Sequence, residues 1–139
     1  MKCKEVRMPY YGRSGDCGYD FFIPMSFKKT ILKPGMSIKI ALGIKCQIPL
    51  GYGLFMCDRS SVSTQMGLKV VAPVIDPSYT GEISGCFFNY TNEDIILEAN
   101  MKIIQGVLIP YIKPIMEIVD SFDRETDRGE NGFGSTNVN

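Results

Sequence analysis

The sequence contains no histidine and no tryptophan. Without histidine, Ser-His-Asp and Cys-His catalysis in their usual forms are excluded, and so is every metal site that needs imidazole. There is also no net charge, because 15 lysines and arginines balance 15 aspartates and glutamates. This balance argues against binding to nucleic acid or to an anionic membrane through bulk charge. Because histidine is absent, any chemistry near neutral pH must use carboxylates as its bases.

Long apolar runs are missing too, and none approaches the roughly 20 residues of a membrane span.

The cysteines are odd in number, are scattered and never form a C-x-x-C pair; they are Cys3, Cys17, Cys46, Cys57 and Cys86. Since the chain opens without a signal peptide, we expect reduced thiols in a cytoplasmic protein. Most of these cysteines are expected to be small buried hydrophobic residues.

The patterning of the 139 residues predicts one all-β domain. Fourteen glycines and eight prolines separate short apolar segments of strand length. Strands are predicted at 21–23, 37–42, 53–57, 83–88 and 102–109, with an edge strand at 112–119 that Pro114 weakens. Residues 60–66 are expected to form a short helix with Ser60 or Ser61 as its N-cap. Many short strands favour a sandwich, a jelly roll or a small barrel.

The last twenty residues differ from the rest of the chain. Residues 120–130 are rich in acidic side chains, and Phe122 is their only large apolar residue. Such a segment cannot form a core, so we predict a core domain at 1–119 and a flexible C-terminal arm at 120–139. The arm nevertheless ends in Gly-Phe-Gly-Ser-Thr at 132–136, an unusual composition for a passive tail.

Five segments carry polar groups suited to a phosphorylated ligand. Arg59 offers a fork of donors beside the hydroxyls of Ser60 and Ser61 at a helix start, although this motif alone favours a plain N-cap with a solvated arginine. Asp20 precedes an apolar strand and could face a metal–phosphate centre or could simply belong to a turn. The amide of Gln105 lies in a predicted strand and could donate to phosphate.

The segment 74–82 resembles a tight β-hairpin. Asp76 follows an apolar pair and precedes a turn, where its carboxylate could face a cleft and the ring of Tyr79 could lie against a ligand. The alternative is an Asp-Pro turn with a packing tyrosine.

The segment 128–136 resembles a phosphate cradle. Its glycines bring backbone N–H groups close to an anion, Arg128 and Ser135 add donors, and Phe133 could stack on a base. It is not a P-loop, because it lacks the Gly-Lys-Ser/Thr ending and no helix can follow it.

Taken together and in this order, these segments resemble the five motifs of the trimeric deoxyuridine triphosphatases (dUTPases). The motifs are Gly18-Tyr19-Asp20-Phe21, Arg59-Ser60-Ser61, Val74-Ile75-Asp76 through Gly81, Lys102-Ile103-Ile104-Gln105, and Arg128-Gly129 with Gly132 to Thr136. The resemblance implies a distorted jelly-roll, or β-clip, subunit in a homotrimer with active sites at subunit interfaces. It also implies hydrolysis of dUTP to dUMP and pyrophosphate with Mg²⁺, and no nucleic-acid or membrane partner.

The same resemblance implies a role for each matching residue. Asp76 would activate water for attack on the α-phosphate, Tyr79 would lie against the deoxyribose, and Asp20 would contact Mg²⁺ through water. Uracil would be recognised by the backbone of the 71–83 segment, including Val71, Val74, Ile75 and Ile83. The phosphates would be bound by Ser60, Ser61, Gln105, Arg128, Ser135 and Thr136 with support from Arg59. Phe133 and Gly134 would cover the base when the arm closes.

Departures from the family pattern include Pro73, which has no N–H in the hairpin approach, and Lys102 in place of arginine. A related dCTP deaminase is the nearest alternative, but such enzymes carry a glutamate where Cys86 stands. A non-catalytic nucleotide-binding regulatory protein of the same fold is the other alternative.

Overall fold

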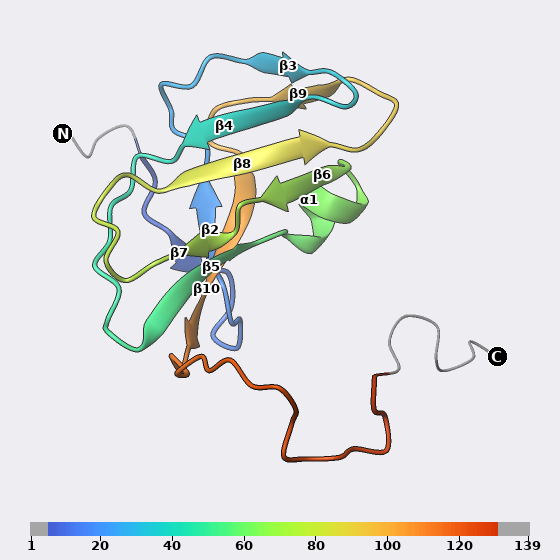
Figure 1. Ribbon diagram of the computed structural model, residues 1–139. Helices are drawn as coiled ribbons and strands as arrows, with labels where there is room; N and C mark the ends of the chain where they lie inside the picture. Colours follow the sequence, from blue (N-terminus) through green and yellow to red (C-terminus); the bar gives the residue numbers. More distant parts are fainter. Residues whose placement is uncertain (1–5, 131–139) are drawn as a thin grey trace.

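The computed structural model of the chain describes residues 6–130 (Figure 1). Within this range the chain forms ten strands and one short helix, α1 (Ser60–Thr64). The predictions of an all-β chain and of a short helix here are confirmed, although the N-cap of α1 is Arg59 rather than a serine. In this same range no helix is long and apolar enough to cross a membrane.

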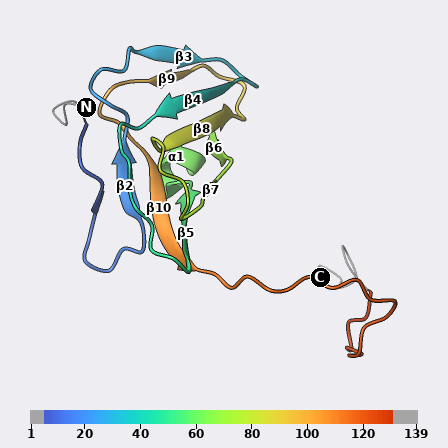
Figure 2. The same ribbon diagram turned by 60° about the vertical axis from the view of Figure 1, so that its left-hand side comes forward.

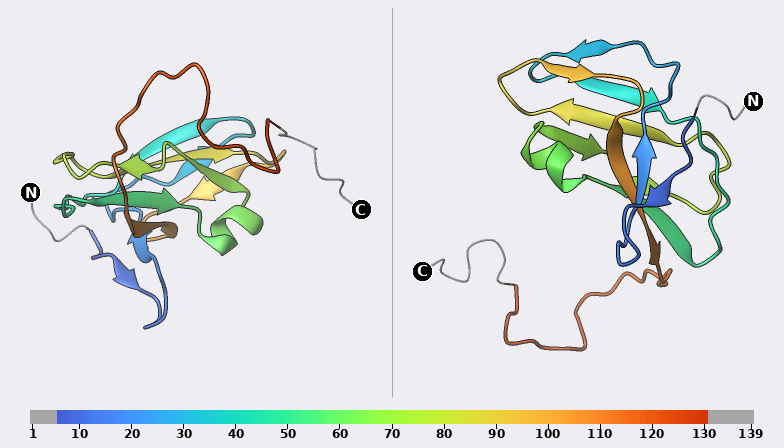
Figure 3. Two further views of the ribbon diagram at one scale, coloured as in Figure 1. Left: turned by 60° about the horizontal axis from the view of Figure 1, so that its bottom comes forward. Right: turned by 180° about the vertical axis from the view of Figure 1, so that it is seen from behind.

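The larger sheet brings distant parts of the sequence together. Its strand order is β1 (Tyr10–Tyr11), β2 (Tyr19–Phe22), β10 (Lys102–Pro110), β5 (Tyr52–Cys57) and β7 (Val74–Ile75), with every neighbouring pair antiparallel. Seen from behind in Figure 3, β2 and β10 run side by side. In this register Gln105 lies between Asp20 of β2 and Cys57 of β5. The central strand therefore places one motif residue between two other segments that the sequence had singled out.

The other strands form a second layer. A three-stranded sheet has the order β4 (Ser37–Ala41), β8 (Ser84–Asn89) and β6 (Leu68–Val71), and a two-stranded sheet joins β3 (Thr30–Leu32) to β9 (Ile95–Leu97). Buried and partly buried residues alternate along β8, as expected for a strand with one face toward a core. Figures 1 and 2 show β4 and β8 crossing the end of the larger sheet. The core between the sheets includes Phe21, Ile23, Leu42, Phe87 and Ile104.

The strands predicted at 37–42, 53–57, 83–88 and 102–109 correspond to β4, β5, β8 and β10. The strand predicted at 21–23 corresponds to β2, shifted by two residues at its start and one at its end.

The strand predicted at 112–119 is wrong. Pro110 ends β10, and the backbone N–H of Tyr111 donates to the carbonyl of Gly51 at 2.9 Å before the chain leaves the body (Figure 2). Ile112, Ile115 and Met116 follow as exposed side chains without strand structure. A short apolar segment forms a strand only beside a partner strand, and Pro114 removes a donor from this segment. The predicted domain boundary at 119 stays a prediction.

One buried polar residue organises the turn after β8. Asn89 is fully buried, and its amide nitrogen donates to the carbonyls of Leu32 at 3.0 Å and Glu93 at 2.8 Å. Its amide oxygen accepts hydrogen bonds from the backbone and the hydroxyl of Thr91. Asn89 thereby ties β3 to the chain that follows β8.

Candidate active site

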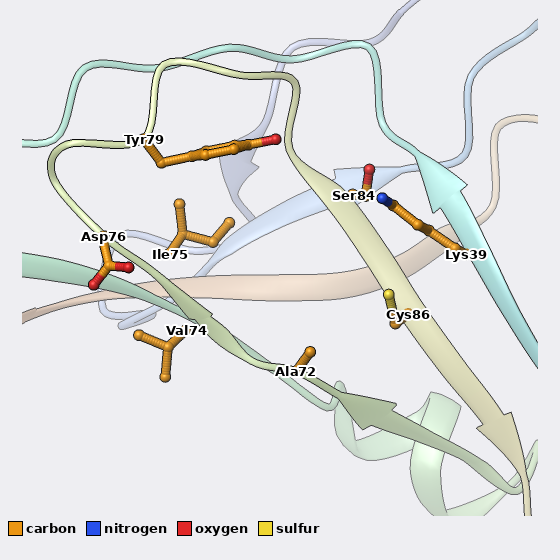
Figure 4. A pocket seen from close by; sticks show the side chains of 8 residues that line it. All are labelled: Lys39, Ala72, Val74, Ile75, Asp76, Tyr79, Ser84 and Cys86. Atoms are coloured by element: carbon orange, nitrogen blue, oxygen red, sulfur yellow. The ribbon is translucent and has the colours of Figure 1, made fainter.

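The first candidate site is a hollow of about 230 Å³ between β7 and the start of β8 (Figure 4), here called the strand-edge hollow. Four residues predicted from the sequence line it, namely Val74, Ile75, Asp76 and Tyr79. The remaining lining residues are Lys39, Ala72, Ser84 and Cys86.

The prediction of a tight hairpin over 74–82 is wrong, since β7 and β8 belong to different sheets. Strand β6 pairs with β8 as far as Val71 opposite Cys86, and the chain then turns at Ala72, whose φ is 56°. After the turn β7 pairs with β5 instead, and the carbonyl of Pro73 accepts from the N–H of Met56 at 2.7 Å. Because β6 and β7 diverge at Ala72, the strand edges separate and leave the hollow between them.

Asp76 and Tyr79 occupy the turn that closes the strand-edge hollow. The N–H of Tyr79 donates to the carbonyl of Asp76 at 3.0 Å, and the Tyr79 hydroxyl donates to the carbonyl of Glu82 at 2.8 Å. A Cβ on Gly81 would meet the tyrosine ring at 2.4 to 2.8 Å, so this position must be glycine for the ring to lie as it does. In Figure 4 the ring lies along one side of the hollow, and Asp76 lies at the end away from Lys39.

Two residues predicted to recognise a base lie outside this hollow. Ile83 is buried in the core, its N–H donates to the carbonyl of Ile44, and its carbonyl accepts from the N–H of Leu42. Val71 pairs with Cys86 in the smaller sheet. The structure therefore places Val74 and Ile75, but not Val71 and Ile83, beside the hollow.

The second candidate site is a hollow of about 500 Å³ at the start of α1, here called the cationic hollow. Five predicted residues come together here, namely Asp20, Arg59, Ser60, Ser61 and Gln105. The other lining residues include Lys102, Arg13 and Asp16, which the sequence argument did not assign to a ligand. Three cations and two carboxylates therefore face one cavity.

Asp20 is held between two of these cations. Its Oδ1 lies 2.6 Å from Arg59 Nε, and its Oδ2 lies 2.9 Å from Lys102 Nζ. Burial raises the pKa of Asp20, but the hydrogen bonds from Lys102 and Arg59 outweigh burial and lower this pKa below its usual value. The hydrogen bond to Asp20 in turn raises the pKa of Lys102. Asp20 is consequently ionised and Lys102 protonated at neutral pH.

Gln105 positions the segment before α1. Its amide nitrogen donates to the carbonyl of Asp58 at 2.8 Å, and the Asp58 carboxylate accepts from the N–H of Val70 at 2.6 Å. A Cβ on Gly18 would lie 2.7 Å from Oε1 of Gln105, so the absence of a side chain on Gly18 leaves room for this amide.

The sequence profile of the dUTPase family matches residues 4–137. The chain belongs to the dUTPase family. It is 36% identical to the deoxyuridine 5'-triphosphate nucleotidohydrolase of Clostridium kluyveri over 96% of this chain and 92% of that protein. It is 32% identical to the enzyme of the same name from Yarrowia lipolytica, over 98% of this chain and 85% of that protein.

Solved structures support the same assignment. The dUTPase of Staphylococcus bacteriophage 80alpha, determined with dUpNHpp, superimposes with a TM-score of 0.85 and 28% identity, covering 97% of this chain and 94% of that chain. The predicted family resemblance is therefore confirmed, and the dCTP deaminase alternative is not favoured. In this dUTPase-family chain, Cys86 lines the strand-edge hollow where a deaminase would carry its glutamate.

The residues of the cationic hollow fit a metal ion only in part. Across residues 6–130 no three acidic or cysteine side chains are grouped closely enough to hold an ion by themselves. Asp16 and Asp20 both line the cationic hollow, however, so they can face a hydrated cation whose other ligands come from a bound phosphate chain.

The two hollows share no lining residue. Asp76 therefore lines the strand-edge hollow, whereas the Asp20–Arg59 pair lines the cationic hollow. Arg128 belongs to the described tail but lines neither hollow. Phe133, Gly134, Ser135 and Thr136 lie outside the described residues.

Lys39 and Arg13 are among the charged lining residues that were not assigned to a ligand from the sequence. Lys39 lies directly opposite Cys86 in the β4–β8 register, and Arg13 precedes the first family motif. Only the strand pairing and the course of the 12–18 loop reveal that these side chains reach the two hollows.

Proposed function

We propose that this protein hydrolyses dUTP to dUMP and pyrophosphate, with the uracil and deoxyribose in the strand-edge hollow and the triphosphate against a cationic hollow. The observation that carries the proposal is the composition of the two hollows. The strand-edge hollow is lined by Asp76 and Tyr79 beside the edges of β7 and β8. The cationic hollow is lined by Arg59, Lys102 and the hydroxyls of two serines.

The strand-edge hollow suits a planar pyrimidine. Strand β7 lies at the edge of its sheet, and Ser84 pairs with Ala41 of β4 without a β6 partner. The backbone groups along these edges can donate to and accept from the base, which is how a strand edge ordinarily recognises an extended partner. The exposed Tyr79 ring can then pack against the deoxyribose, where an added 2′-hydroxyl would collide.

The cationic hollow suits a triphosphate. Arg59 and Lys102 provide donors beside Ser60 and Ser61, and guanidinium and ammonium groups form the strong, charge-assisted hydrogen bonds that phosphate oxygens accept. Mg²⁺, when bound with the substrate, neutralises phosphate charge, and Asp20 and Asp16 would contact it through water.

Asp76 is the general base of the proposed reaction. Its carboxylate accepts a proton from a water molecule as that water attacks the α-phosphorus. The bond from the α-phosphorus to the bridging oxygen breaks, so that dUMP is formed and pyrophosphate leaves. The new P–O bond thus comes from water, and the proton resides on Asp76 until it returns to solvent.

The separation of the two hollows supports a homotrimer with shared sites. In such a trimer the strand-edge hollow of one copy would face the cationic hollow of another. The arm at 120–139, with Arg128, Phe133, Gly134, Ser135 and Thr136, would close over such a shared site and exclude water. The four described cysteines are free thiols, which is typical of a cytoplasmic enzyme.

The decisive experiment measures pyrophosphate release from dUTP, dCTP, dTTP and UTP with Mg²⁺. Release from dUTP alone at an appreciable rate is expected. Ammonia release from dCTP without pyrophosphate would overturn the proposal in favour of deamination, and tight dUTP binding without turnover would favour a regulatory protein. A sizing measurement that gives a monomer would overturn the shared site.

A further inference from the structure

The strand-edge hollow is lined by a lysine side chain that belongs to none of the family motifs. Lys39 lies on β4, opposite Cys86 of β8, and lines the hollow together with Asp76, Tyr79 and Ser84. Figure 4 shows its side chain extending from β4 toward Ser84, with the ammonium group on the side of the hollow that the Tyr79 hydroxyl faces. A charged donor is therefore present at the end of the hollow away from Asp76.

The ammonium group of Lys39 has no protein partner in the described part of the chain. Four other lysines are paired there with carboxylates, which are Lys29 with Glu98, Lys33 with Asp94, Lys69 with Asp58 and Lys102 with Asp20. The only carboxylate that lines the strand-edge hollow is Asp76, which Figure 4 places at the opposite end. The donors of Lys39 thus remain available to whatever occupies the hollow.

The surroundings of Lys39 favour a base rather than a phosphate as its partner. Ala72, Val74 and Ile75 give the strand-edge hollow apolar walls, and its volume is less than half that of the cationic hollow. A flat ring with a few polar atoms on its edge fits apolar walls with isolated donors. The triphosphate, by contrast, already has the cations of the cationic hollow.

We propose that Lys39 determines base specificity by donating a hydrogen bond to the O4 carbonyl of uracil. This inference rests on the proposed dUTP hydrolysis and deepens it. A lysine ammonium carries three donors and no acceptor. Uracil has a carbonyl at C4, whereas cytosine has an amino group there that also donates. Cytosine would set donor against donor and leave its amino group and the ammonium group without a mutual hydrogen bond, which disfavours cytosine at this position.

The test compares Lys39→Met, which removes the donors but keeps much of the stem, with Lys39→Arg, which keeps charge and donors. Lys28→Met serves as the matched control, because Lys28 is exposed and lines neither hollow. For each protein, kcat/KM is measured for dUTP and dCTP, and inhibition constants are measured for deoxyuridine and deoxycytidine, which carry no phosphate.

Lys39→Met should lower kcat/KM for dUTP about tenfold, the usual effect of losing a hydrogen bond to a charged group. The value for dCTP should stay level or rise, so the ratio of the two falls. Inhibition by deoxyuridine should weaken by a similar factor, while Lys39→Arg and Lys28→Met keep the wild-type ratio. Because Lys39 is exposed on β4, the Lys39→Met protein should melt at the wild-type temperature.

Two outcomes would overturn the inference. An equal loss for dUTP and dCTP, with deoxyuridine inhibition unchanged, would mean that Lys39 attracts the triphosphate instead of reading the base. An unchanged ratio in Lys39→Met would mean that it does neither. Both outcomes require a wild-type protein that turns over dUTP, whereas absence of that turnover would refute the proposed function itself.

Discussion

Asp20 Oδ1 lies 2.6 Å from Arg59 Nε, and this contact joins β2 to the N-cap residue of α1. Only 9% of the Asp20 side chain is exposed, against 23% for Arg59 and 33% for Lys102. A single shielded carboxylate therefore organises two cations at the cationic hollow. Removing it would leave both cations facing each other across the cavity.

Asp20 should make the stability of the protein depend on pH. Its pKa in the folded state lies below the unfolded value of about 3.9, so its contribution is complete above that value and is lost as the pH falls through the lowered pKa. At pH 7, Asp20→Asn should reduce the free energy of unfolding by about 2 kcal/mol, since it breaks a shielded ion pair. Urea denaturation at fixed protein concentration measures this loss.

Below a pH of about 4 the difference between wild type and Asp20→Asn should shrink. A difference that is the same at pH 7 and at acid pH would contradict the ionic role of Asp20. Asp94→Asn is the control, because the Lys33–Asp94 pair is exposed and such pairs contribute about 0–1 kcal/mol.

Asp76→Asn should lower the turnover of dUTP by on the order of 10²–10⁴-fold, the usual contribution of a general base. Affinity for dUTP should change little, because the amide keeps the shape of the side chain. Pyrophosphate release gives the turnover, and calorimetric titration with dUTP gives the affinity. Unchanged turnover would eliminate Asp76 as the base, and Asp94→Asn should behave like wild type.

Asn89→Leu should destabilise the fold by about 3 kcal/mol, because it removes the hydrogen bonds of a fully buried amide at similar side-chain volume. The groups that lose a partner are the carbonyls of Leu32 and Glu93 and the N–H of Thr91. Chemical denaturation measures the effect. Asn92→Leu, at an exposed position in the same turn, should stay within about 0.5 kcal/mol of wild type, and equal losses in the two variants would refute the role of Asn89.

Removal of residues 128–139 should reduce dUTP turnover by on the order of 10²-fold while leaving the melting temperature of the body unchanged. Residues 128–130 are exposed, so the core does not depend on them. Removal of 137–139 alone is the control, because it spares the Gly-Phe-Gly-Ser-Thr segment. Full activity of the protein that lacks residues 128–139 would show that the arm does not act as a lid.

The sequence predicted those features that depend on neighbouring residues. Alternation in 37–42 predicted β4, the short apolar segment 102–109 predicted β10, and the adjacent positions of Arg59, Ser60 and Ser61 predicted that they lie together, as they do in the cationic hollow. The apolar residues of 112–119 predicted a strand that the structure lacks, because a short apolar segment does not say whether a partner strand is present.

Features that depend on strand pairing could not be predicted. The chain turns at Ala72, and β6 pairs with β8 whereas β7 pairs with β5 in the other sheet. Lys39 enters the strand-edge hollow only because β4 pairs with β8 in a register that sets it opposite Cys86. A shift of one residue would have moved its side chain to the other face.

The position of β10 between β2 and β5 has a consequence for how the protein is made. Among the described strands, the one that completes the larger sheet is the last to leave the ribosome, and Lys102 lies 82 positions after its partner Asp20 in the sequence. Until Lys102–Pro110 has been synthesised, β2 and β5 have unpaired edges, and such edges promote association between chains. A nascent chain that stops before Lys102 therefore lacks the centre of the sheet, and we expect it to aggregate or to be degraded rather than to persist as a partly active fragment.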